Sequence, residues 1–162
     1  MSKYKFTVPT LDDAKTEKAI EVLQFNLDIL NDLALTLKHA HWNVTGDSFI
    51  AVHEMLDPEI DDIRDGVDQI AERIATLGGS PNGLSSSVLE TAKSSIPEYG
   101  LKKRDKTDNH LKKVNEQYTA VETILRSSIA KLDDLDLISS NLLQDILGKM
   151  ELFQWKVRSH LI

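Results

Sequence analysis

The stretch that decides the fold is residues 39–57, HAHWNVTGDSFIAVHEMLD, which has the pattern of one helix ending, a short turn and a second helix beginning. Residues 46–48, GDS, form the turn, and either the aspartate or the serine is a suitable N-cap for the helix that follows. Three of the chain's five histidines lie in this stretch. The resulting helical hairpin places His41 and His53 at the same end.

Apolar residues recur every three or four positions on both sides of this turn, which is the spacing of one helix face. The first stripe runs from Ile20 to Leu37 and reaches His41 along a helix of about 25 residues. The second runs from Phe49 to Leu77 and stops at residues 78–79, GG, a strong helix-end signal. Pro58 removes one backbone hydrogen bond from the second helix, but the stripe continues through it, so one continuous helix is expected.

The rest of the chain predicts two more long helices, from about residue 107 to 132 and from about 136 to 161. Residues 80–104 contain turn formers and a short apolar segment at Val88 and Leu89, which indicates a crossover with one short helix. Four long helices with one long connection predict an all-α fold, a ferritin-like four-helix bundle. We expect a single domain over residues 1–162, with residues 1–14 as a flexible tail.

Composition excludes several classes of protein. The chain has 162 residues, no cysteine and a formal net charge of −7. Disulfides, thiolate metal sites and a cysteine nucleophile are therefore excluded. No uncharged apolar run approaches the roughly 18 residues of a membrane span, and the N-terminus has no secretory pattern, so we expect a cytoplasmic protein.

Four potential metal ligands share one side of the second helix. At 100° per residue, His53, Asp57, Asp68 and Glu72 lie within about 100° of one another. The first pair and the second pair are nevertheless separated by about 22 Å along the helix axis. One chain therefore cannot hold one metal with both pairs. Two copies packed antiparallel about residues 62–63 would instead bring the first pair of each copy opposite the second pair of the other.

Other interpretations of these residues stay open at this point. A helix so rich in acid gives His-x3-Asp and Asp-x3-Glu spacings by chance, and an acidic face is usually solvated. His41 fits a core or capping position, His39 points away from it as a solvated or supporting residue, and His110 and His160 fit structural or surface roles.

The segment AHWNVTGDSFIAVHEMLD…VDQIAERIATLGG resembles the signature of the Dps family, the DNA-protecting mini-ferritins of starved bacteria. The resemblance implies a ferroxidase centre for iron at a two-fold interface within a hollow homododecamer. It assigns five metal ligands: His41 from HWN, His53 and Asp57 from HEMLD, and Asp68 and Glu72, supplied by the partner subunit. The implied reaction is oxidation of Fe(II), preferably by hydrogen peroxide, with Fe(III) stored as a mineral, which would protect the cell against oxidative stress.

The resemblance implies two further functional elements. Trp42, beside His41, is either an electron donor near the metals or a packed interface aromatic. The turn containing Asp133, Asp134 and Asp136 falls where a three-fold pore for iron entry is implied, and the same residues also suit a helix N-cap.

Two alternative functions remain. A metal-dependent hydrolase of amide or ester bonds would use the same paired site to activate water, although no Ser/His/Asp set accompanies it. A DNA-compacting nucleoid protein would need a basic tail, whereas residues 1–14 offer Lys3 and Lys5 against Asp12 and Asp13. Each chain of an assembly adds a net charge of −7, which repels the phosphate backbone of DNA. We therefore expect weak or no DNA binding.

Overall fold

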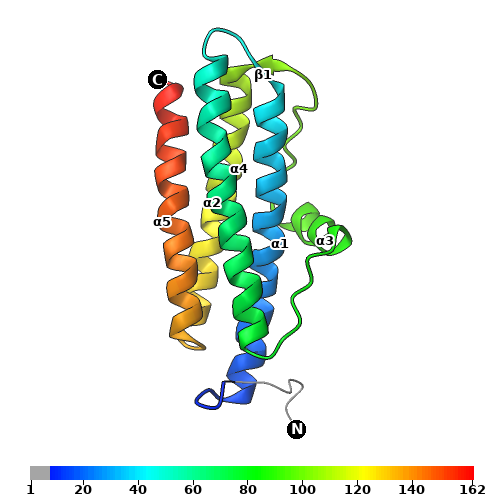
Figure 1. Ribbon diagram of the computed structural model, residues 1–162, viewed down its shortest axis with the longest axis vertical. Coiled ribbons are helices and arrows are strands. Elements are labelled where there is room, and N and C mark those ends of the chain that lie inside the picture. The colour runs from blue at the N-terminus through cyan, green and yellow to red at the C-terminus, as the bar shows by residue number, and fades with distance from the viewer. Residues whose placement is uncertain (1–7) are drawn as a thin grey trace.

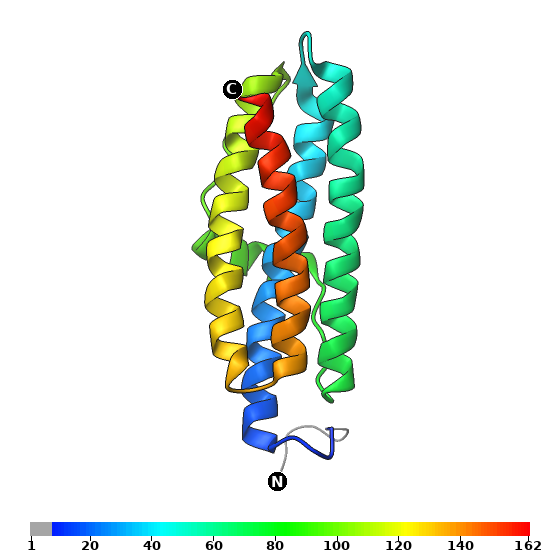
Figure 2. The same cartoon turned by 90° about the vertical axis from the view of Figure 1, so that its left-hand side faces the viewer.

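The computed structural model describes residues 8–162 and confirms the ferritin-like bundle predicted from the sequence. The four long helices are α1 (Asp13–Asn43), α2 (Phe49–Thr76), α4 (Thr107–Asp133) and α5 (Leu137–His160). Helices α1 and α5 run in one direction and α2 and α4 in the other (Figures 1 and 2). Because α2 and α4 are parallel, the chain between them must return along the whole bundle, and this return is the long crossover.

The crossover is attached to the outside of the bundle. It carries the short helix α3 (Ser85–Ser95), which packs across α1 (Figure 1). The buried carboxylate of Asp28 fixes α3 to α1, since its Oδ2 accepts hydrogen bonds from Ser87 Oγ at 3.0 Å and Thr91 Oγ1 at 2.9 Å. A parallel pair of two-residue strands, β1 (Val44–Thr45) and β2 (Asp105–Lys106), then brings the segment after α1 beside the start of α4. Two-residue strands give no sequence pattern, so this pair was not predicted.

Histidines outside the predicted site hold the end of the crossover. His110 is fully buried, and its Nδ1 lies 2.7 Å from the Tyr99 hydroxyl, so its expected structural role is confirmed. His39 Nε2 donates to the Leu101 carbonyl at 2.9 Å, which anchors the crossover to α1. His160 is exposed, as expected for a surface residue.

The helix ends follow from local chemistry. Helix α1 is 31 residues long because Asp12 caps it before the apolar stripe begins, with its Oδ1 accepting from the Lys15 N–H at 3.0 Å. The predicted tail, residues 1–14, overlaps the start of α1, because Asp13 and Ala14 are helical. Residues 1–7 lie outside the described part of the chain. At the end of α2, Gly78 adopts a φ of 94°, which glycine tolerates best.

The core is apolar apart from a few polar groups, of which Glu59 is the most unusual. Glu59 is 0% exposed, although it lies in the turn after Pro58 on α2. The Tyr118 hydroxyl donates to Glu59 Oε2 at 2.9 Å, while Oε1 has no hydrogen-bond partner and lies 3.8 Å from Lys156 Nζ. Burial raises the pKa of Glu59 from 4.5 to about 7, and the tyrosine and lysine only partly oppose this.

No helix in the described part of the chain is both long enough and apolar enough to cross a membrane.

Glu59 predicts a pH-dependent stability. The folded chain binds the Glu59 proton more tightly than the unfolded chain. The contribution of Glu59 to the free energy of unfolding is therefore greatest below pH 4.5 and falls as the pH rises towards 7. The loss is about 3 kcal/mol per chain at pH 8. Glu59→Gln should remove this loss, which thermal unfolding at pH 5, 6, 7 and 8 would measure.

Glu54→Gln is the matched control, because Glu54 is an exposed carboxylate on the same helix. If both variants keep the wild-type pH dependence, Glu59 is not the group responsible.

Candidate metal centre

His41 and His53 lie together at the end of the α1–α2 hairpin, as the sequence predicted. Their rings stack with centroids 3.7 Å apart and an angle of 21° between the planes. His41 belongs to the last turn of α1 and is 5% exposed, while His53 lies in the second turn of α2 and is half-buried. Gly46, with a φ of 110°, allows the connection between the two helices to be this short.

Each histidine is fixed by the backbone of the other. His41 Nδ1 donates to the His53 carbonyl at 2.8 Å, and His53 Nδ1 donates to the His41 carbonyl at 3.0 Å. A carbonyl oxygen can only accept, so each Nδ1 carries the proton and each Nε2 keeps its lone pair. Burial lowers the pKa of His41, which favours the neutral ring. Metal-binding histidines are typically oriented by such bonds from the second ring nitrogen.

Asp57 supplies a carboxylate to the same end of the hairpin. Its Oδ1 lies 3.4 Å from His41 Nδ1 and 2.5 Å from Lys38 Nζ. The hydrogen bond from Lys38 lowers the pKa of Asp57, so the carboxylate is ionised at neutral pH. Lys38 was not predicted from the sequence, although its position three residues before His41 puts both side chains on one face of α1.

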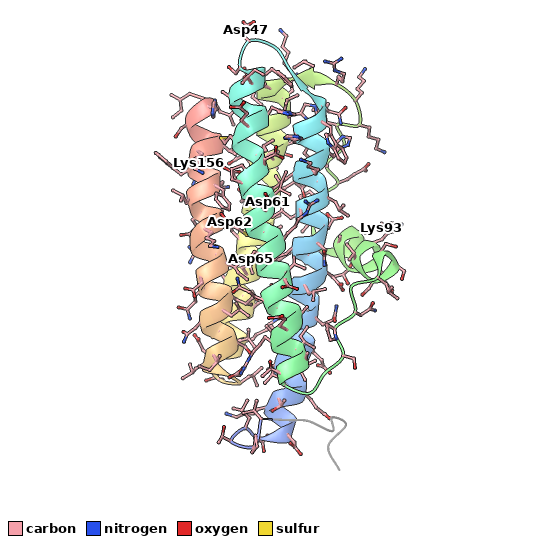
Figure 3. The ribbon with its side chains drawn as sticks, in the orientation of Figure 1. Asp47, Asp61, Asp62, Asp65, Lys93 and Lys156 are labelled. Atoms are coloured by element: carbon pink, nitrogen blue, oxygen red, sulfur yellow. The ribbon has the colours of Figure 1, made fainter. Side chains whose placement is uncertain are left out.

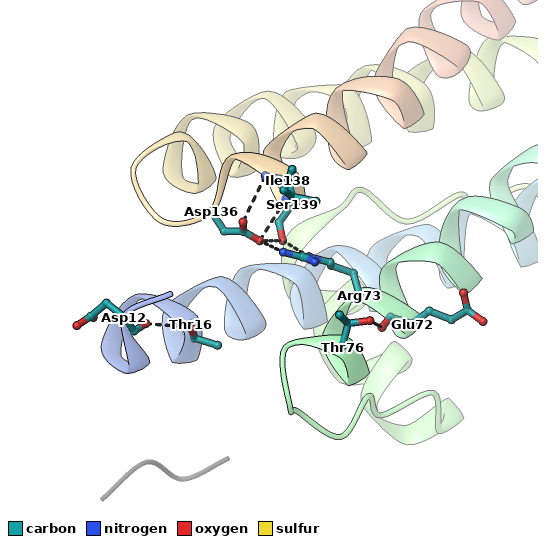
Figure 4. Close-up of polar contacts among 8 residues, drawn as sticks. All are labelled: Asp12, Thr16, Glu72, Arg73, Thr76, Asp136, Ile138 and Ser139. Atoms are coloured by element: carbon teal, nitrogen blue, oxygen red, sulfur yellow. Dashed lines mark hydrogen bonds and ion pairs between the residues drawn. The ribbon is translucent and has the colours of Figure 1, made fainter. Parts of the chain in front are cut away.

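Asp68 and Glu72 lie further along α2 and do not join this group. Both are exposed, and Glu72 projects away from the bundle (Figure 4). Within residues 8–162, no three His, Asp or Glu side chains of the chain are placed to hold a metal ion. Asp68 and Glu72 therefore stay predicted ligands that a partner subunit would supply.

The face of α2 that leads to Asp68 and Glu72 is acidic. Asp61, Asp62 and Asp65 lie along its middle (Figure 3), and the side chains of Asp61 and Asp62 are 78% and 42% exposed. Trp42, beside His41, is 66% exposed. Within one chain the indole therefore lies at the surface next to the histidine pair, and both of its predicted roles remain predictions.

The turn between α4 and α5 contains the three predicted pore residues, Asp133, Asp134 and Asp136. Asp136 is 5% exposed and caps α5, with its two carboxylate oxygens 3.3 Å from the N–H groups of Ile138 and Ser139 (Figure 4). Arg73 Nη2 at the end of α2 also donates to Asp136 Oδ2 at 2.7 Å. The N-cap interpretation is confirmed for Asp136, and its carboxylate is buried in these contacts. Asp133 and Asp134 are exposed, and their role in a pore stays a prediction.

The chain is similar to known proteins in both sequence and structure. Residues 20–162 match the family model of the ferritin-like domain. The chain is 46% identical over 156 residues to the DNA protection during starvation protein of Mycolicibacterium smegmatis, covering 96% of this chain and 84% of that protein. The chain belongs to the Dps family.

Two further relatives extend this Dps-family match. The solved structure of DpsA14 from Streptomyces coelicolor superposes with a TM-score of 0.92 at 41% identity, covering 99% of this chain and 94% of that one. The fine tangled pili major subunit of Haemophilus ducreyi is 48% identical over 155 residues, covering 96% of this chain and 80% of that protein. The Dps fold is therefore shared by proteins whose names describe different roles, and the function has to be argued from the site.

Proposed function

We propose that this Dps-family chain is a ferroxidase that oxidises Fe(II) and stores Fe(III). The observation that supports this best is the histidine pair, in which both Nδ1 atoms are bonded to carbonyl groups and both Nε2 atoms keep a lone pair. Asp57 adds an ionised carboxylate at the same end of α2. Imidazole nitrogen and carboxylate oxygen together suit iron, since the oxygen ligands stabilise the Fe(III) product.

The complete centre is proposed to form between two copies. Two α2 helices packed antiparallel about residues 62–63 would bring Asp68 and Glu72 of the partner subunit to the histidine pair. The exposure of both carboxylates in the single chain supports this, because their side chains are free to contact a second copy. We extend the proposal to a hollow dodecamer built from such dimers on the basis of family membership.

Hydrogen peroxide is the proposed oxidant. Two Fe(II) ions, one peroxide and two protons give two Fe(III) ions and two water molecules. If a single iron reacted, it would supply one electron and release a hydroxyl radical. Holding two irons at one interface therefore completes the reduction of peroxide to water. Trp42 is proposed to donate an electron when only one iron is bound, since it follows His41 in the sequence and its side chain is exposed.

The proposal predicts fast iron oxidation that depends on the named ligands. Fe(II) and peroxide mixed with the assembled protein should give ferric absorbance within seconds and a growing mineral core. His53→Ala and Asp57→Asn should each slow the initial rate by at least about 100-fold, because each removes a ligand from the centre. Stopped-flow absorbance measures the rate, and size-exclusion chromatography checks that the oligomer persists.

The matched control is His160→Ala, which removes an exposed histidine on α5, outside the α1–α2 hairpin. Wild-type rates in the His53 and Asp57 variants would show that these residues do not form the centre. A hydrolase would instead cleave ester or amide substrates with bound zinc, and the absence of iron oxidation together with such cleavage would favour that function.

DNA protection is proposed to come from removing iron and peroxide rather than from binding DNA. The chain carries 26 acidic and 19 basic residues, so an assembly repels the phosphate backbone at physiological salt. A gel-shift assay at about 150 mM salt should show no retarded DNA, whereas the protein should still prevent strand cleavage by Fe(II) and peroxide. A clear gel shift at this salt concentration would contradict the proposal.

A further inference from the structure

A cation lies inside the proposed centre, at the carboxylate that the chain itself contributes. The Lys38 ammonium donates to Asp57 Oδ1 at 2.5 Å, and the Lys38 side chain is only 23% exposed. Lys38 lies one turn before His41 on α1, and Asp57 lies one turn after His53 on α2. The ammonium therefore holds one of the two carboxylate oxygens that Asp57 would offer to a metal.

This cation changes the charge of the half-site. The single chain contributes one ionised carboxylate, Asp57, and two imidazoles whose geometry fits the neutral form. Lys38 cancels the formal charge of Asp57, so the half-site on one chain has no net charge with which to attract Fe(II). The negative charge of the complete centre then comes from Asp68 and Glu72 of the partner subunit.

We propose that Lys38 is the counter-ion of the empty centre and that iron binding displaces it from Asp57, so that Lys38 sets the iron concentration at which the centre fills. This inference rests on the proposed function. Lysine suits the task because its ammonium is a single charge on a flexible stem that can swing into solvent. Arginine would hold the carboxylate with two parallel hydrogen bonds and would leave less readily.

The competing role for Lys38 is to orient Asp57 towards the metal. Orientation would leave the ammonium bonded to Asp57 after the metal binds, so that two positive charges share one carboxylate. The repulsion between these charges opposes what a single orienting hydrogen bond contributes. In the counter-ion role, filling the centre breaks the Lys38–Asp57 pair, which is worth roughly a tenfold change in an equilibrium constant.

Three variants test this inference in the assembled protein. Lys38→Met keeps the packed stem and removes the charge, and Lys38→Arg keeps the charge and strengthens the contact. Lys113→Met is the control, since Lys113 pairs at 2.7 Å with Glu116 within α4. The probe is Zn(II), which binds without redox chemistry, measured by calorimetry. Fe(II) oxidation is followed at increasing iron concentration.

The expected result is a shift in affinity with little change in turnover. Lys38→Met should lower the half-saturating Zn(II) concentration and the KM for Fe(II) by about tenfold, with kcat changed by less than about threefold. Lys38→Arg should raise both concentrations, and Lys113→Met should leave them unchanged. Unchanged or weaker Zn(II) binding by Lys38→Met would overturn the counter-ion role.

Failure of this inference is distinguishable from failure of the proposed function. If Asp57→Asn abolishes Zn(II) binding while Lys38→Met has no effect, the centre stands and the counter-ion role is wrong. If Zn(II) binds equally well to wild type and to Asp57→Asn, the proposed centre is wrong, and with it the role of Lys38.

Discussion

The pair of hydrogen bonds between His41 and His53 is the interaction on which the rest of the site depends. Each ring donates to the carbonyl of the other residue, at 2.8 and 3.0 Å, so side chain and backbone lock the end of α1 to the start of α2. The same bonds select the tautomer, and they leave both Nε2 lone pairs available. The fold of the hairpin and the chemistry of the centre therefore share one cause.

Helix α2 serves two environments at once. Its inner face carries Glu59, which is sealed in the core against Tyr118, while its outer face carries exposed Asp68 and Glu72. The helix stays continuous through Pro58 because its apolar stripe is buried along the whole length. The distance between Asp57 and Glu72 is thus fixed by one continuous helix, and bending within one chain cannot bring the two residues together. Assembly is the remaining way to bring these predicted ligands together.

The sequence was sufficient to predict the helices and the histidine pair. The apolar stripes with their turn and helix-end residues predicted all four bundle helices, and the exposed carboxylates of α2 lie where the spacing placed them. Helix α1 began earlier than predicted because Asp12 is a capping residue that precedes the stripe. The contacts of Asp136 with Arg73 and of Lys38 with Asp57 were not predicted for a different reason. The two partners in each pair are distant in sequence, so these contacts exist only after packing.

Complementation between two inactive chains tests the shared centre most directly. One chain carries His41→Ala and His53→Ala, and the other carries Asp68→Ala and Glu72→Ala. Each alone should assemble without fast Fe(II) oxidation. Random co-assembly makes about half of the dimers mixed, and each mixed dimer contains one intact centre out of two. The mixture should therefore recover about a quarter of the wild-type rate. A mixture that remains as inactive as the separate chains would contradict a centre built from two subunits.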